Sequence, residues 1–79
     1  STFSRSYKKL SFEEKLLAEK REKVFRDNAF ENMLKTHKLK GKWRGYWAFS
    51  ITYSHRIMFE FIDHETVGFV NVGDHKIYC

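Results

Sequence analysis

The spacing of apolar residues changes near the middle of the chain from intervals of three and four to intervals of two. The first interval is typical of helices and the second of strands. Residues 11–28 (SFEEKLLAEKREKVFRDN) predict one long helix that ends near Asn28. Ser11 and Glu14 have the spacing of a capping box, in which each side chain accepts a hydrogen bond from an orphan backbone N–H. Residues 2–10 predict a shorter helix that runs antiparallel to it.

Beyond residue 45 apolar and polar residues alternate, as in strands with one buried face. Three strands are predicted, at residues 46–53 (YWAFSITY), 55–62 (HRIMFEFI) and 66–72 (TVGFVNV). Consecutive strands joined by short turns favour an antiparallel meander. We therefore expect an α+β fold, in which two antiparallel helices pack on one face of a small, mainly antiparallel twisted sheet.

The alternation in the second strand assigns its residues to two faces. If Ile57, Phe59 and Phe61 face the helices, then Arg56 and Glu60 face the other side of the sheet. A two-layer domain has no helix on that side, so Arg56 is expected on an uncovered surface. An alternative is that Arg56 pairs with Glu60, two residues along on the same face.

The size and composition describe one small domain, residues 1–79. Eight Phe, four Tyr and two Trp give it a large apolar content, so the chain is predicted to be globular. The only cysteine, Cys79, excludes a disulfide framework and favours a reducing compartment, the cytoplasm. No signal peptide is visible, and no apolar run approaches the roughly 20 residues that span a bilayer.

The formal net charge of +5 indicates an anionic partner, because a basic surface accelerates association with polyanions. Nucleic acid, an acidic protein segment and a membrane surface all remain open. The charge is concentrated in residues 36–47 (THKLKGKWRGYW), which hold no acid. Their lysines and arginine form either a solvated loop or a binding surface, whereas Trp43, Tyr46 and Trp47 are expected to pack in the core or at the sheet edge.

The candidate chemistry is that of RNA cleavage. There is no Cys/His pattern with zinc spacing and no phosphate-binding glycine loop, so neither a metal site nor a cofactor is expected. RNA supplies its own nucleophile, the 2′-hydroxyl, and histidine or tyrosine can move the protons while arginine and lysine meet the added charge. His55, at a strand start, is more typical of a structural residue, and His64 of a solvated turn. Composition alone does not favour a nuclease over a binding module.

Four short motifs, taken in order, resemble the RelE/ParE superfamily of toxins from toxin–antitoxin pairs, most closely its YafQ and YoeB branch of messenger-RNA-cleaving members. The motifs are His37-Lys38-Leu39-Lys40-Gly41, His55-Arg56-Ile57, Gly73-Asp74-His75 and Tyr78. The resemblance covers essentially the whole chain and implies a ribosome-associated, metal-independent messenger-RNA endonuclease.

The resemblance also implies roles for particular residues. Arg56 is expected to hold the scissile phosphate, His75 to transfer a proton, Tyr78 to orient or protonate near the cut, and His37 to contribute to catalysis. The residues expected to bind RNA are Lys38, Lys40, Lys42, Arg44 and His55. The implied partners are a cognate antitoxin, through which the protein is expected to oligomerise, messenger RNA and the ribosome, without a membrane.

The chain departs from the family pattern in three places. Some members use a carboxylate base between helix and sheet, for which Glu31 lies too early, and others carry an acid or histidine where this chain has Ala48, Ser50 and Thr52. Many members begin with a strand before the first helix, and Ser1-Thr2-Phe3 leaves almost no room for one, so either that strand was truncated or a sheet edge is open for pairing with another chain. Two alternatives therefore remain: a ParE-like toxin that inhibits DNA gyrase, and a degenerate antitoxin-binding module without catalysis.

Overall fold

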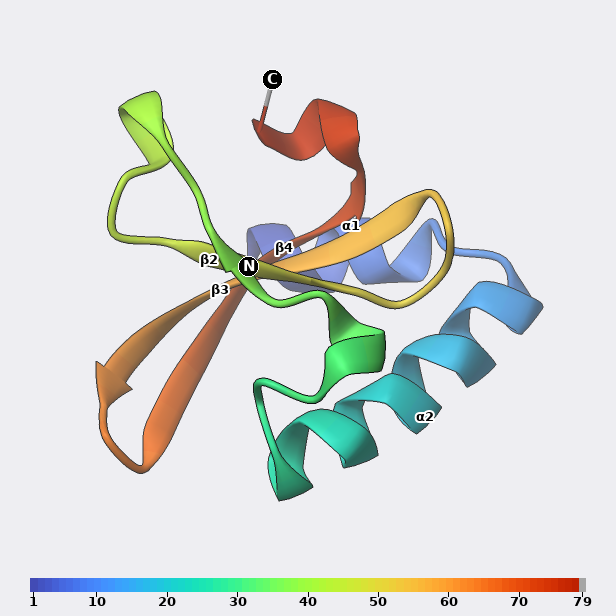
Figure 1. Cartoon of the computed structure of the whole chain (residues 1–79). Coiled ribbons are helices and arrows are strands. Elements are labelled where there is room, and N and C mark those ends of the chain that lie inside the picture. Colours follow the sequence, from blue (N-terminus) through green and yellow to red (C-terminus); the bar gives the residue numbers. More distant parts are fainter. Residues whose placement is uncertain (79) are drawn as a thin grey trace.

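Both predicted helices are present. In the computed structural model, which describes residues 1–78 apart from the side chain of residue 78, α1 spans Thr2–Lys8 and α2 spans Phe12–Asp27. The capping box begins α2: the Ser11 N–H donates to Glu14 Oε1 at 2.8 Å, and the Glu14 N–H donates to Ser11 Oγ at 3.1 Å. The chain reverses direction between the two helices, as Figure 1 shows.

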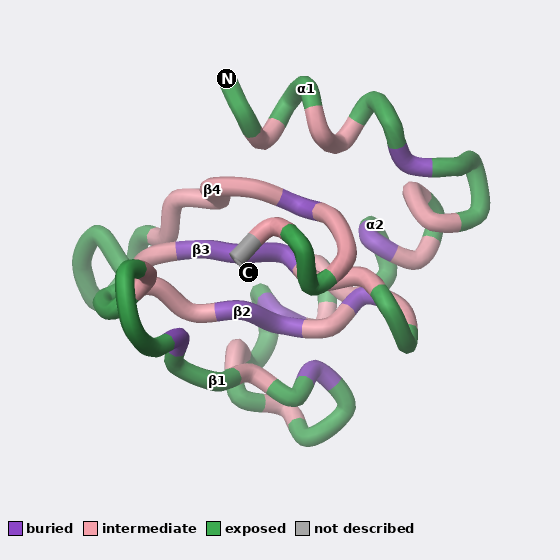
Figure 2. The backbone as a smooth tube through the Cα atoms, turned by 90° about the horizontal axis from the view of Figure 1, so that it is seen from above, coloured by how far each residue is buried: buried purple, intermediate pink, exposed green. Residues whose placement is uncertain are grey.

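Four antiparallel strands form the sheet, in the order β1-β2-β3-β4 (Figure 2). They are β1 His37–Lys38, β2 Trp47–Ser50, β3 His55–Asp63 and β4 Thr66–Asp74. The last three were predicted, and β1 was not. The described part of the chain also contains three short 3-10 helices: η1 Asn32–Leu34, η2 Gly41–Trp43 and η3 His75–Tyr78.

Aromatic side chains join the helices to one face of the sheet. The ring of Phe25 on α2 stacks on Phe49 of β2 at 4.5 Å and meets the edge of Phe59 of β3 at 4.9 Å. The ring centre of Phe3 on α1 lies 5.4 Å from that of Phe69 on β4. The helix α1 runs beside β4, at the edge of the sheet away from β1 (Figure 2). The predicted α+β arrangement is therefore confirmed, with α2 over the sheet and α1 against its β4 side.

The other face of the sheet is covered at its centre, so the expectation of an uncovered surface is wrong there. Ala48 and Met58 have no exposed surface. The residues packed around them are Leu39, Trp43, Tyr46, Val70 and Ile77. Gly41 and Gly45 have φ of +67° and +99°, values that glycine adopts without strain and that let the β1–β2 connection fold back. Figure 1 shows this connection and η3 on the side of the sheet opposite α2.

Candidate functional site

Arg56 lies on the sheet face opposite the helices, as predicted. It pairs with Ser50 of β2 and with Gly73 of β4, and cross-strand partners share a face. Its neighbour Ile57 belongs to the helix-side core, whereas Met58 belongs to the cluster on the second face. Arg56 Nη1 donates to the backbone oxygen of Tyr53 at 3.4 Å.

The alternative pairing of Arg56 with Glu60 is not formed. Among the described residues, no carboxylate lies within ion-pair distance of this guanidinium. Arg56 is half-buried, so its charge is partly shielded from water but not neutralised. A fixed cation of this kind is suited to bind a phosphate oxygen.

His37 belongs to the same face as Arg56. It pairs with Ala48, which in turn pairs with Met58, so all three side chains lie on one side of the sheet. The Nδ1 atom of His37 is 2.9 Å from the carbonyl oxygen of Lys35. Because a carbonyl only accepts, Nδ1 carries the proton, and in the neutral ring Nε2 is left as a proton acceptor.

His75 is positioned by η3, which begins directly after β4. Gly73, two residues earlier, pairs with Arg56, and an added Cβ at Gly73 would lie only 2.7 Å from Cγ2 of Ile77. Ile77 also packs in the cluster around Met58. η3 therefore crosses the sheet face opposite the helices, close to the Arg56–Gly73 pair. His75 itself is exposed. The predicted role of Tyr78 depends on its side chain, which lies outside the described part of the chain.

The cations of residues 36–47 do not all lie on one side of the sheet, and their predicted contact with RNA stays a prediction. Lys38 pairs with Trp47, whose ring packs against the helix-side core, and Lys38 Nζ lies 5.5 Å from the centre of that ring. Lys38 therefore faces away from the side that carries Arg56. Lys42 Nζ lies 5.6 Å from the ring of Trp43 on the second face. Trp47 packs against the helix-side core, and Trp43 and Tyr46 pack against the cluster around Met58, as the sequence predicts. The cations of this segment are exposed: Lys38, Lys40, Lys42 and Arg44.

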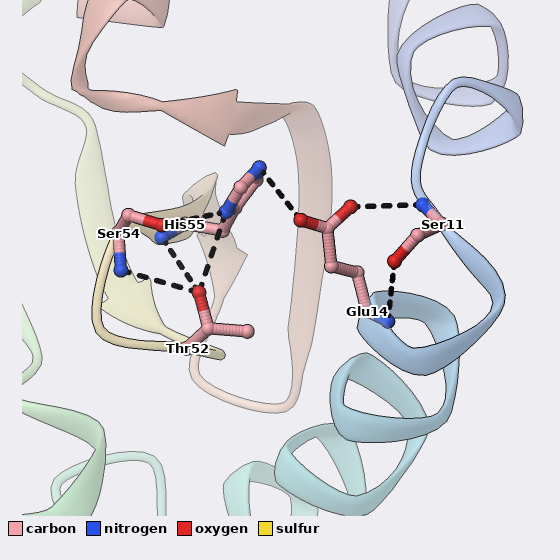
Figure 3. Close-up of polar contacts among 5 residues, drawn as sticks. All are labelled: Ser11, Glu14, Thr52, Ser54 and His55. Atoms are coloured by element: carbon pink, nitrogen blue, oxygen red, sulfur yellow. Dashed lines mark hydrogen bonds and ion pairs between the residues drawn. The ribbon is translucent and has the colours of Figure 1, made fainter.

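His55 connects β3 to the start of α2 (Figure 3). Its Nε2 lies 3.4 Å from Glu14 Oε2, and its Nδ1 lies 3.3 Å from Thr52 Oγ1 and 3.1 Å from Ser54 Oγ. The pKa of Glu14 is lowered, mainly by the hydrogen bond from the Ser11 backbone N–H and further by His55, although burial opposes the shift. These contacts favour the structural interpretation of His55; its predicted contact with RNA stays a prediction.

Two cations near Arg56 were missed by the sequence analysis. Arg21 of α2 and Lys35, which follows η1, line the same pocket as Arg56, with a volume of about 220 Å³. Arg21 could have been noticed, because it interrupts the apolar stripe of its helix. Lys35 gave no signal, because the left-handed backbone that turns the chain there, with φ of +52°, is not evident from the sequence.

Residues 1–78 contain neither a cluster of metal ligands nor a helix suited to cross a membrane. No three side chains of the types His, Cys, Asp and Glu gather there as ligands for a metal ion. None of the helices in this part of the chain has the length and apolar character to cross a membrane.

The fold resembles that of YafQ and YoeB/ParE toxins. No protein-family model and no curated protein matches the sequence. Among solved structures, YafQ from E. coli strain BL21(DE3) has a TM-score of 0.80 and 16% identity over 98% of this chain and 89% of that chain. A YoeB/ParE toxin from Agrobacterium tumefaciens has a TM-score of 0.75 and 18% identity, covering 94% of this chain and 91% of that one.

A third similar structure is a copper-bound mutant toxin from Helicobacter pylori. Its TM-score is 0.75 at 18% identity, and the match covers 100% of this chain and 92% of that one. All three chains are covered nearly end to end, so the similarity concerns the whole domain. The resemblance that the sequence motifs indicate is thus confirmed for the fold.

Proposed function

We propose that this chain is the toxin of a type II toxin–antitoxin pair and that it cuts messenger RNA at the ribosome. The observation that carries the proposal is the register of β3 and β4, which pairs Arg56 with Gly73, two residues before His75. The cation for the phosphate thereby comes from β3, and the imidazole that can move a proton comes from the start of η3, directly after the adjacent strand β4. The likeness to YafQ and YoeB/ParE toxins supports the same conclusion.

The proposed reaction needs two proton transfers and one fixed charge. The RNA 2′-hydroxyl loses its proton and attacks the adjacent phosphorus, the bond from phosphorus to the 5′-oxygen breaks, and the leaving oxygen takes up a proton. The products are a 2′,3′-cyclic phosphate and a 5′-hydroxyl. Arg56 binds the phosphate and stabilises its added negative charge. His37 and His75 are the two proton carriers, since imidazole both gives and takes protons near neutral pH.

Because the chain departs from the family pattern, the proposal assigns both proton transfers to histidine. Ala48, which faces the same side as His37, carries no acid, and Ser50, the partner of Arg56, offers only a hydroxyl. His37 Nε2 remains available as an acceptor because Nδ1 is held by the Lys35 carbonyl. The reaction proceeds without a carboxylate base, and no resident metal is part of the proposal.

Primer extension on cellular messages after induced expression tests the proposal. We expect cuts with the unaltered protein and a loss on the order of a hundredfold with Arg56→Ala or His75→Ala, because each removes a group that acts on the transition state. The matched control is His64→Ala, a histidine 89% exposed in the β3–β4 turn. Normal cutting by both Arg56→Ala and His75→Ala excludes this site.

The same variants separate the proposal from its alternatives. A gyrase inhibitor needs none of His37, His75 or Tyr78, so the alanine variant of each stays toxic and no message is cut. A degenerate module is harmless even before mutation. We further propose that an antitoxin with an acidic or amphipathic segment covers the cationic site in the cytoplasm and links the toxin into a larger assembly.

A further inference from the structure

A pocket of about 220 Å³ gathers cations from three parts of the chain. Arg21 comes from α2, Lys35 from the turn after η1, and Arg56 from β3. The remaining lining includes the hydroxyl-bearing residues Ser50, Thr52 and Tyr53, together with Met33 and Ile51. Of the described residues, no Asp or Glu lines this pocket.

The three cations lack protein counter-charges. Within residues 1–78, the ion pairs join Arg26 to Glu22, His55 to Glu14 and His64 to Glu65, and none includes Arg21, Lys35 or Arg56. Like charges around one pocket repel each other, and the repulsion is larger where protein replaces water on one side. An anion in the pocket removes this repulsion and receives hydrogen bonds from guanidinium, ammonium and hydroxyl donors.

We propose that this pocket binds a phosphodiester of the RNA strand next to the one that is cut, with Arg21 and Lys35 as its own ligands. The inference rests on the proposed function, because Arg56 lines the pocket and is also the residue proposed to bind the phosphate that is cut. The shared residue makes the two phosphate positions neighbours along one strand. Arg21 and Lys35 hold the strand in register, so that the next phosphate lies under Arg56 and the histidines.

The geometry favours a phosphate over a planar carboxylate. The cationic residues that line the pocket belong to a helix, a turn and a β-strand, and a tetrahedral group presents oxygens in more directions than a planar one. The loop cation Lys38 makes no such set, since it lies over the Trp47 ring on the helix side. The RNA strand is therefore predicted to leave the active site toward α2.

Binding of a short single-stranded 2′-O-methyl RNA, which lacks the attacking hydroxyl, tests the proposal without any cleavage. The test variant is Arg21→Gln with Lys35→Asn, since glutamine suits a helix and asparagine tolerates the left-handed backbone at residue 35. The control variant is Lys20→Gln with Lys23→Gln, which removes the same charge from exposed positions of α2 that do not line the pocket. Affinity is measured by fluorescence anisotropy over a series of salt concentrations.

We expect the test variant to bind on the order of tenfold more weakly and the slope of log affinity against log salt to fall by about 0.7 for each lost phosphate contact. The control variant is expected to change affinity less than twofold. Inorganic phosphate is expected to shift the NMR signals of Arg21 and Lys35 and to compete with the RNA. Equal losses in the two variants, or no loss in the test variant, overturn the proposal.

Two outcomes separate this inference from the proposed function. If inorganic phosphate binds the pocket but the test variant keeps its full affinity for RNA, the pocket belongs to a free phosphate compound and the RNA subsite is wrong. If the test variant loses affinity but the unaltered protein never cuts messages, the subsite stands and the nuclease assignment fails. Thermal unfolding of both variants checks that each is folded.

Discussion

The two faces of the sheet are built from the same strands but in different ways. On the helix side, the rings of Phe25, Phe49 and Phe59 pack together, and all three are nearly or fully buried. On the second side, only Ala48 and Met58 are buried within the strands, beneath short 3-10 segments rather than a long helix. The first face supplies most of the apolar burial, and the second leaves its rim free for charged side chains.

This difference shows why a thin cover is useful at the second face. A helix over the whole sheet would bury Arg56, whose charge is costly to remove from water without a partner. Short segments cover only the centre and leave Arg56 half-buried beside an open pocket. A domain of this size has little stability to spare, so the aromatic face must carry the fold.

The largest expected effect comes from comparing two adjacent residues of β3 that face opposite ways. Phe59→Ala removes a fully buried ring of the helix-side core and is expected to lower the free energy of unfolding by about 3–5 kcal/mol. Met58→Ala removes the largest buried side chain of the second face, where η2 and η3 can move inward to fill the space. It is expected to lower the free energy of unfolding by about 2 kcal/mol. Urea denaturation followed by circular dichroism measures both values.

Met58→Leu serves as the control for this comparison, because a side chain of similar volume is expected to cost less than about 1.5 kcal/mol. If Met58→Ala proves as costly as Phe59→Ala, the two faces contribute equally to stability. The division between a helix side that supports the fold (the supporting face) and a second side that carries the site (the functional face) is then wrong.

A smaller effect is expected where η3 crosses the sheet. Gly73→Ala places a methyl group 2.7 Å from Ile77 Cγ2, so η3 must move away from the strand. Overpacking of this kind typically costs about 1–3 kcal/mol. Because η3 begins with His75, we also expect RNA cleavage to fall by more than the loss of stability explains.

The double variant Gly73→Ala with Ile77→Ala tests the cause, since it removes the group that the new methyl meets. We expect it to recover part of the cleavage activity in primer extension even though Ile77 is lost from the second face. Normal cleavage by Gly73→Ala alone contradicts the view that η3 positions His75.

The elements that follow from local signals were predictable from the sequence. The capping box located the start of α2, and alternation located β2, β3 and β4, because these signals depend on residues near each other in the chain. Alternation also placed Arg56 on the correct face. The short strand β1 gave no such signal, since two residues are too few for a period to be visible.

The candidate site was less predictable because its parts meet only through tertiary packing. The cover over Met58 depends on Ile77 reaching back from η3, which no local pattern indicates. The pocket depends on Arg21, Lys35 and Arg56 converging from three elements. The sequence analysis instead assigned RNA binding mainly to the cations of residues 36–47, although Lys38 faces the helix side because it pairs with Trp47.

The smallest expected effect concerns the contact that joins α2 to the turn before Arg56. Glu14 has a lowered pKa in the folded protein, so its charged form stabilises the fold at pH values above the ordinary glutamate range of about 4.3, and this stabilisation is lost as pH falls through the lowered pKa. Glu14→Gln is therefore expected to lower the melting temperature at neutral pH, and the gap from the unaltered protein is expected to close in acid.

Glu13→Gln is the matched control, because its carboxylate holds neither Ser11 nor His55. Since Glu14 belongs to the supporting face, cleavage well below the melting temperature should stay within about twofold of normal, within the range of a surface substitution. A pH-independent gap in melting temperature, or a large loss of cleavage in a folded Glu14→Gln variant, shows instead that His55 and its partner take part in the site on the second face.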